Sequence, residues 1–219
     1  MRGGAIGDFI FTLPVLRALR DRWPDACVEI VGYPHVAHLA LAGGLVSKVH
    51  SLDRAGIARL FARNLSPDEH LRNFFDSFDV VISFLHDPDG VVQTNLLAMD
   101  VDLIYRSPVA PQIHAVDHLL KSLESMAIYE SGVAPSLSLD EATRETGRRW
   151  LADADIAQDA VAIHAGSGSP RKNWPLERFL DVSCALLSNG LRPFFVLGEA
   201  DHAIEPAVRS AATKIGPVM

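Results

Sequence analysis

The chain has 219 residues, of which 48% are hydrophobic and 21% charged, a composition typical of globular proteins that bury a core. Its formal net charge of −7 argues against a nucleic acid partner, because a phosphate backbone is bound by clustered Lys and Arg. A small anionic ligand is not excluded, since a few local donors are enough to hold one.

We expect a protein without a signal peptide or transmembrane segment. Asp8 interrupts the apolar region that a signal peptide needs, and the longest apolar runs fall short of the roughly 18–20 residues that cross a bilayer. Cys27 and Cys184 each lie in apolar surroundings, which predicts two buried free thiols. A reducing, cytoplasmic location follows as the default expectation.

The first 129 residues alternate between helical and strand-like patterns. Apolar residues at helical spacing predict a helix over 9–22, ended at Trp23 because Pro24 disfavours the helical conformation of the residue before it. Further on we expect strands at 28–32, 48–52, 78–87 and 101–105, helices at 35–42, 95–99 and 114–129, and a polar amphipathic stretch at 57–75.

A Pro-, Ser- and Gly-rich stretch at 130–138 is the best candidate for a linker. After it the alternation restarts, with helices predicted at 140–153 (capped by Asp140), 175–188 and 203–214 and strands at 160–164 and 193–197. This order predicts an α/β protein with two Rossmann-like, doubly wound parallel-sheet domains, at residues 1–135 and 136–219. Ligands are expected at the carboxyl ends of the strands.

The first candidate site is the turn from Gly3 to Asp8. It lacks the Gly-x-Gly-x-x-Gly spacing of dinucleotide-binding loops. Asp8 suits the N-cap of the following helix, which explains it without any function. A carboxylate at the mouth of such a turn is also exposed to a substrate and could accept its proton. The local sequence leaves both interpretations open.

The second candidate site is the loop 164–175, which follows a strand and opens a helix at Pro175, expected at the first helical position. Its glycines permit close approach of a ligand, and serine hydroxyls and helix N–H groups are donors for phosphate oxygens. We predict a phosphate site that consists of Ser167, Gly168, Ser169 and Lys172. The Gly-Lys-Ser/Thr ending of a Walker loop is missing, and a plain connection with solvated basic residues is the alternative.

Other groupings have structural explanations. His114 and His118 could share a metal, but no third ligand is evident, and a surface or interdomain pair is favoured. The segment 86–90 reads as a turn, with contact to an acceptor left open. Glu199 and Asp201 follow a strand on the ligand side, where a ribose contact is conceivable.

At the two loops the sequence resembles the family 9 glycosyltransferases, the ADP-heptose:lipopolysaccharide heptosyltransferases. Residues 6–14 (IGDFIFTLP) match the family's Gly-Asp-x-x-x-Thr-x-Pro opening. Residues 163–167 (IHAGS) and 172–175 (KNWP) match its second motif, and the His-x-x-Asp helix within 114–123 lies between them. The resemblance covers essentially the whole chain.

The resemblance implies a GT-B fold with an acceptor domain, a nucleotide-sugar domain and a site in the cleft between them. It implies inverting, metal-independent transfer without a cofactor, from a donor such as ADP-heptose to a lipopolysaccharide-core or other glycan acceptor at the cytoplasmic face of the inner membrane. Asp8 would be the general base. Lys172, with Ser167, Ser169 and backbone N–H groups, would hold the diphosphate.

The sequence departs from the family pattern at both ends. Members have a first strand ahead of the Gly-Asp turn, where only Met1 and Arg2 stand here, and they continue beyond the position of Met219. We therefore expect a chain truncated at both ends, with an incomplete second domain. The alternative function is that of a non-catalytic glycan- or nucleotide-binding fragment.

Overall fold

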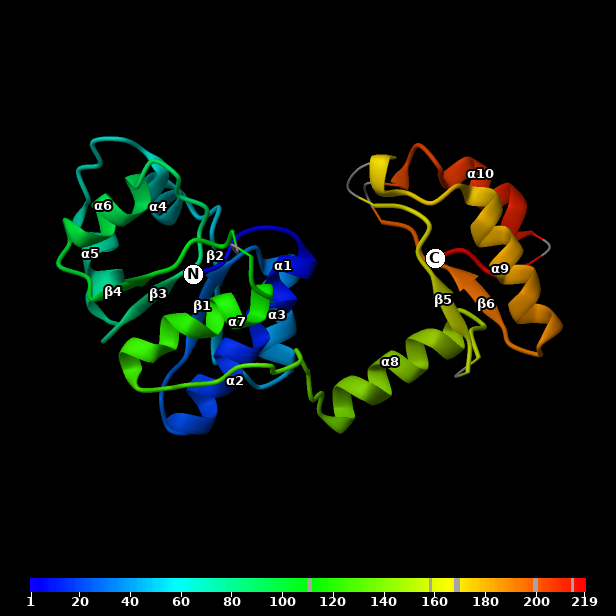
Figure 1. The fold of residues 1–219 in the computed structure, drawn as a ribbon, viewed down its shortest axis with the longest axis horizontal. Helices are drawn as coiled ribbons and strands as arrows, with labels where there is room; N and C mark the ends of the chain where they lie inside the picture. The colour runs from blue at the N-terminus through cyan, green and yellow to red at the C-terminus, as the bar shows by residue number, and fades with distance from the viewer. Residues whose placement is uncertain (110–111, 158, 168–169, 199–200, 214) are drawn as a thin grey trace. The chain divides into compact units, whose positions relative to one another are not determined.

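The chain folds into two compact units, Met1–Asp140 and Glu141–Met219, in the computed structural model (Figure 1). The structure describes residues 1–109, 112–157, 159–167, 170–198, 201–213 and 215–219. The first unit extends past the expected boundary at residue 135. Leu137 explains this, because its side chain packs against the core of the first unit next to Gly43.

The first unit contains two pairs of parallel strands joined by the N-terminus of the chain. β1 (Glu29–Gly32) pairs with β2 (Lys48–Ser51), and β3 (Val81–Ser83) pairs with β4 (Leu103–Tyr105). Between the pairs, the Arg2 N–H donates to the Val31 carbonyl and the Phe84 N–H donates to the Met1 carbonyl, both at 2.9 Å. The residues before the Gly3 turn thus run between β1 and β3 and connect the two pairs.

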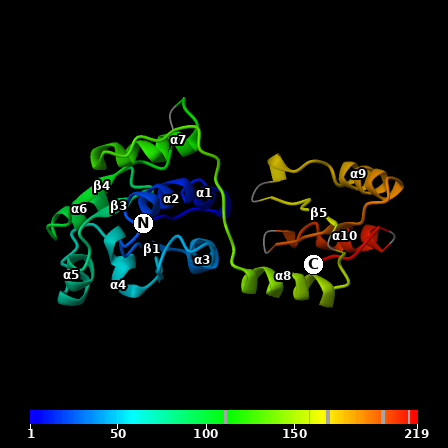
Figure 2. The same cartoon turned by 90° about the horizontal axis from the view of Figure 1, so that it is seen from below.

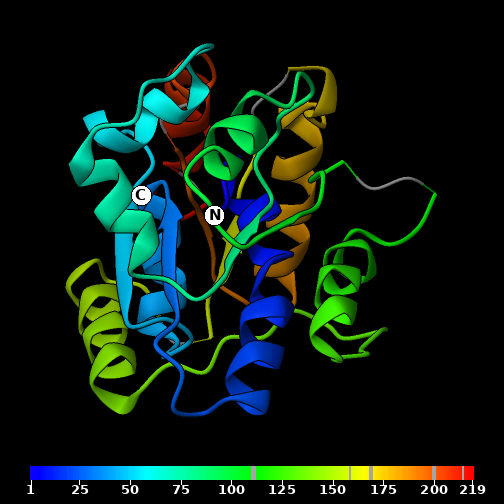
Figure 3. The same cartoon turned by 90° about the vertical axis from the view of Figure 1, so that its left-hand side faces the viewer.

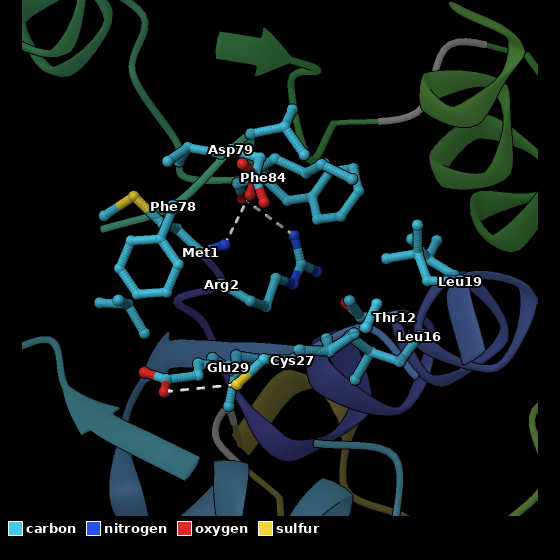
Figure 4. A pocket seen from close by; sticks show the side chains of 18 of the residues that line it. Met1, Arg2, Thr12, Leu16, Leu19, Cys27, Glu29, Phe78, Asp79 and Phe84 are labelled. Atoms are coloured by element: carbon cyan, nitrogen blue, oxygen red, sulfur yellow. Dashed lines mark hydrogen bonds between the residues drawn. The ribbon is translucent and has the colours of Figure 1, made fainter. Parts of the chain in front are cut away.

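A cavity of about 440 Å³ borders Met1 and Arg2 and is lined by residues of β1, α2, α5 and β3. Figure 4 shows Met1 and Arg2 between Phe78 and Phe84 on one side and Glu29 on the other. The Met1 amine donates to the Ile82 carbonyl at 2.6 Å. Burial, and secondarily the charge of Arg2, lowers its pKa from 8.0 to about 5.

The helices cover both faces of the strands. In the first unit they are α1 (Ile6–Ile10), α2 (Leu13–Arg22), α3 (Pro34–Ala42), α4 (Ala55–Ala58), α5 (Glu69–Asp76), α6 (Val91–Leu97) and α7 (Ala115–Leu120), with the 3₁₀ segments η1 (Arg59–Phe61) and η2 (Lys121–Met126). Neighbouring strand residues point to opposite faces. Ile30 accordingly packs with α2 and α3, whereas Val31 packs with α4 and α5.

The opposite faces are also seen at β3, where Ile82 packs with α2 and α7 while Val81 packs with α5 and α6. Figures 2 and 3 show α2 and α7 side by side although they are far apart in sequence. Helices on both faces of parallel strands make the doubly wound arrangement that the sequence predicts.

Two helix predictions are wrong in detail. The helix expected over 9–22 is divided into α1 and α2 at Phe11 and Thr12. Pro14 explains the division, because proline lacks an N–H and its ring clashes with the preceding helical turn. The helix expected over 114–129 changes to η2 and ends before Ala127, which takes a left-handed conformation at φ 56°.

The second unit contains α8 (Glu141–Asp153), β5 (Val161–Ile163), η3 (Pro170–Lys172), α9 (Leu176–Ser188), β6 (Pro193–Phe195) and α10 (Glu205–Ala212). β5 and β6 pair in parallel, and residues 217–219 run along the other side of β6, where the Phe195 N–H donates to the Pro217 carbonyl. Phe195 is fully buried between these segments and the helices. Pro175 stands at the N-cap of α9, one position before the predicted one.

The prediction of buried thiols is wrong, because Cys27 and Cys184 are both exposed. On α9 the buried residue is Ser183, and each helical residue turns about 100° from the last, so its neighbour Cys184 points outward. Apolar neighbours in sequence therefore gave a false signal of burial. In the described parts of the chain, no helix combines the length and the apolar character that spanning a membrane requires.

Candidate functional site

Asp8 lies at the carboxyl end of the N-terminal segment, in the third position of α1 and not at its N-cap. Its Oδ2 accepts a hydrogen bond from the Ala5 N–H at 3.1 Å. The side chain is 53% exposed. The capping explanation is therefore wrong in position, although the carboxylate does satisfy an N–H of the first helical turn. The other carboxylate oxygen, Oδ1, lies 3.6 Å from Nη2 of Arg2.

The backbone around Asp8 is fixed by buried polar groups. Arg2 donates to the Asp8 carbonyl from Nε at 3.2 Å and from Nη2 at 2.9 Å. The Thr12 hydroxyl approaches the same carbonyl at 3.4 Å. Arg2 is 4% exposed and Thr12 is 2% exposed. The exposed carboxylate of Asp8 thus extends from a backbone that two buried side chains hold by hydrogen bonds.

Gly4 is required at the start of this turn. Its φ is +94°, in the region that favours glycine, and a Cβ there would lie 2.8 Å from Asp8 Oδ2. The carboxylate of Asp8 therefore lies directly against the Gly4 backbone. Sequence reasoning identified the glycines but could not show this contact.

The other polar residues near this edge of the first unit have structural partners. Asp87 is buried and its Oδ2 accepts from the Gln93 N–H at 2.9 Å, so it satisfies an N–H in the first turn of α6, whose N-cap is Gly90. His114 caps α7 by accepting from the Val116 N–H. His118 is buried and bonded to the Ser107 carbonyl at 2.8 Å. Among the described residues, no group of His, Cys, Asp or Glu side chains is arranged to hold a metal ion, and His114 and His118 form no such group.

The candidate phosphate loop lies at the carboxyl end of β5 in the second unit. The Ser167 hydroxyl donates to the Asn173 Oδ1 at 2.6 Å, which draws the two ends of the loop together. Lys172 ends η3 and is exposed, three residues before the N-cap of α9. Gly168 and Ser169, the other predicted phosphate contacts, lie outside the described residues, as does Glu199.

Asp201 is a buried carboxylate that lies against Gly166 at the start of this loop. It is 3% exposed, and its Oδ2 accepts from the Gly198 N–H at 2.7 Å and lies 3.7 Å from His164 Nδ1. A Cβ on Gly166 would lie 1.5 Å from Asp201 Oδ1, so only glycine fits there. The carboxylate that we considered for a ribose contact is instead buried under the loop.

The structure thus holds two candidate half-sites, one in each unit: the first follows the N-terminal segment beside β1 and β3, and the second lies at the carboxyl end of β5. The first brings together Asp8, Arg2 and Thr12, and the second brings together Ser167, Asn173 and Asp201 under the loop that ends at Lys172. Sequence reasoning missed Arg2, Thr12 and Asn173. Thr12 and Asn173 stand in the two motifs that resemble family 9, whereas the signal for Arg2 was its place beside the Gly3 turn.

Solved structures show which known proteins share the fold of this chain. No protein-family model and no curated protein matches the chain. A crystal structure of a family 9 glycosyl transferase from Veillonella parvula matches over 99% of this chain and 66% of its own, with a TM-score of 0.72 and 17% identity. ADP-heptose lps heptosyltransferase II of E. coli matches over 99% of this chain and 70% of its own, with a TM-score of 0.70 and 13% identity.

A third structure, E. coli heptosyltransferase WaaC with ADP-2-deoxy-2-fluoro heptose, matches over 100% of this chain and 76% of its own, with a TM-score of 0.64 and 16% identity. The chain therefore spans about two thirds of the length of the first of these structures. The predicted fold class, two Rossmann-like domains of the GT-B type, is confirmed. The resemblance to family 9 that the two motifs indicate is confirmed at the level of the fold.

Proposed function

We propose that this chain carries the acceptor domain and part of the donor domain of a family 9 glycosyltransferase. It would transfer a heptose or related sugar from a nucleotide-sugar such as ADP-heptose to a lipopolysaccharide-core or other glycan acceptor. The observation that carries the proposal is the exposed Asp8 carboxylate on a fixed turn, in a chain with the fold of heptosyltransferases.

The reaction would be a single displacement with inversion. Asp8 takes the proton of the acceptor hydroxyl as its oxygen attacks the anomeric carbon of the donor sugar. The bond between that carbon and the diphosphate oxygen breaks, and the nucleoside diphosphate leaves with the electron pair. Positioned proton transfer of this kind contributes roughly 10²–10⁴-fold to the rate.

The second half-site would hold the leaving diphosphate. Lys172 would supply a positive charge. Gly168, Ser169, the start of α9 and Ser167, whose hydroxyl would turn from Asn173 to the phosphate, would supply hydrogen-bond donors. Donors arranged in advance stabilise negative charge as it develops on the leaving group. In this mechanism Lys172 takes the part that a metal ion has in other transferases, so we propose transfer without metal or cofactor.

The proposed acceptor suggests where in the cell the enzyme acts. A core glycan under assembly is attached to a lipid, so we propose that the enzyme acts at the cytoplasmic face of the inner membrane as a peripheral protein. Sedimentation with vesicles that contain the acceptor lipid tests this. Recovery of the protein in the supernatant at every lipid concentration would contradict it.

Calorimetric titration with ADP tests the donor half-site. Lys172→Ala is expected to weaken ADP binding at least about tenfold, because a charge-assisted hydrogen bond contributes about 1.5–3 kcal/mol. Arg144→Ala is the matched control, since Arg144 is an exposed cation on α8 of the same unit. Equal dissociation constants for the Lys172→Ala variant and the unchanged protein would remove Lys172 from the site.

The same preparation separates the enzyme from the non-catalytic fragment. ADP-heptose and an acceptor glycan are supplied with EDTA present, and the new linkage is followed by NMR of the anomeric proton. The proposal expects turnover, with the configuration inverted and no loss of rate in EDTA. ADP binding without turnover would favour the binding fragment, and a retained configuration would contradict single displacement.

A further inference from the structure

Arg2 is buried to an extent that is unusual for arginine, with only 4% of its surface exposed. Its Nε and Nη2 donate to the Asp8 carbonyl at 3.2 and 2.9 Å, and its Nη1 donates to the Phe84 carbonyl at 3.2 Å. Figure 4 shows the guanidinium directed toward Phe84 at the end of β3. One side chain thus ties the turn that carries Asp8 to the neighbouring strand.

Burying the positive charge of Arg2 costs free energy, because the charge loses its contact with water. Burial lowers the pKa of Arg2, and the negative charge of Asp8 opposes this effect. A buried cation is expensive, and an apolar side chain of similar length would fill the space without that penalty. The carboxylate near Arg2 is that of Asp8, whose Oδ1 lies 3.6 Å from Nη2. Two of the three hydrogen bonds of the guanidinium, and its ion pair, are therefore made with Asp8.

We propose that Arg2 is a positioning residue, which fixes the backbone of Asp8 so that the exposed carboxylate keeps one orientation toward the acceptor hydroxyl. This inference rests on the proposed function of Asp8. The planar fork of a guanidinium holds a carbonyl more rigidly than a single ammonium does. On the other side, Gly4 and the Ala5 N–H confine Oδ2. Together they restrain both the backbone and the carboxylate.

The kinetic test compares Arg2→Met with Arg2→Lys. A misplacement of about 1 Å lowers rates by about 10²-fold, so Arg2→Met is expected to lower kcat by about that factor and to leave the donor KM unchanged. Arg2→Lys is expected to recover about tenfold of this loss, because it keeps the charge and one donor but not the fork. An unchanged kcat in Arg2→Met overturns the inference. A parallel loss of donor affinity also does, because Arg2 lies outside the donor loop.

Amide hydrogen exchange provides a test that needs no turnover. The N–H groups of Phe9, Phe11 and Thr12 are bonded within the turn. Arg2→Met is expected to raise their exchange rates about tenfold or more, while Val36 and Ala37 in α3 exchange as before. Unchanged rates at the turn overturn the inference.

If Arg2→Met fails to fold, Arg2→Lys carries the same comparison, and a uniform rise across the first unit in both variants assigns Arg2 to folding alone and overturns the inference. Asp8→Asn tests the proposed function separately. Turnover in Asp8→Asn would refute the base assignment whatever the exchange rates show. Loss of turnover in Asp8→Asn with unchanged exchange in Arg2→Met would refute only the role of Arg2.

Discussion

Acetylation of the Met1 amine is expected to change how the stability of the first unit depends on pH. The amine is buried in the folded state, where its pKa is about 5, compared with 8.0 when it is exposed to water. Between these values the unfolded chain binds a proton that the folded chain does not bind. The free energy of unfolding therefore falls as the pH is lowered from 8 to 5 and is constant below that range.

The magnitude follows from the same two values. Each unit of difference in pKa corresponds to about 1.36 kcal/mol, so a shift from 8.0 to about 5 sets a ceiling of about 4 kcal/mol. Met1 as a whole residue is only half-buried, and screening by water brings the expected loss to about 1–3 kcal/mol. An acetyl group removes the titration and keeps the N–H donor to Ile82, and the adjoining cavity has room for it.

The assay is urea unfolding at pH 8, 6.5 and 5 of the free and acetylated chains. Trp23 reports on the first unit once Trp150 and Trp174, both in the second unit, are replaced by Phe. Acetylation leaves the side chains of the protein unchanged, so the difference between the two pH profiles isolates the amine. Identical profiles would refute the reasoning.

Three substitutions test the packing around the half-sites. Gly166→Ala is expected to weaken ADP binding by about tenfold or more, measured by calorimetry, because the new Cβ would lie 1.5 Å from Asp201 Oδ1. A Cβ added at Gly147 in α8 would meet nothing within 4 Å. Gly147→Ala is therefore expected to leave ADP binding unchanged and to raise the free energy of unfolding, measured in urea, by about 0.5–1 kcal/mol. Leu123→Ala removes a fully buried side chain and is expected to destabilise the first unit by about 2–5 kcal/mol in urea unfolding. A smaller effect of Gly166→Ala than of Gly147→Ala on ADP binding, or a loss below 1 kcal/mol for Leu123→Ala, would contradict the packing described.

Strand and helix order was predictable because apolar periodicity is a local property. The Val-Val-Ile run at 80–82 predicted a buried strand, and β3 lies there. The division between α1 and α2 was also readable in principle, since Pro14 stands in the sequence, but the apolar stripe over 9–22 hid it. The exposure of Cys184 was not readable, because it depends on which face of α9 meets the core.

The support of each half-site depends on contacts between distant residues. Arg2 binds the Phe84 carbonyl, 82 positions away in sequence, and Asp201, which follows β6, lies against Gly166, which follows β5. No local pattern encodes such pairs. Asp8 and Lys172 could be proposed from the sequence because they stand in turns with recognisable glycines, whereas the groups that hold those turns became visible only in the fold.

Transfer by the Asp8→Asn variant tests the central claim most directly. The substitution keeps the shape of the side chain and removes the base, and Asp21→Asn on the exposed surface of α2 is the matched control. A protein that carries residues 1–219 is supplied with ADP-heptose and an acceptor glycan, and ADP release is measured. We predict a loss of about 10²–10⁴-fold in kcat for Asp8→Asn, with ADP binding and the Asp21→Asn rate unchanged. Turnover by Asp8→Asn at the rate of the Asp21→Asn control would contradict the account.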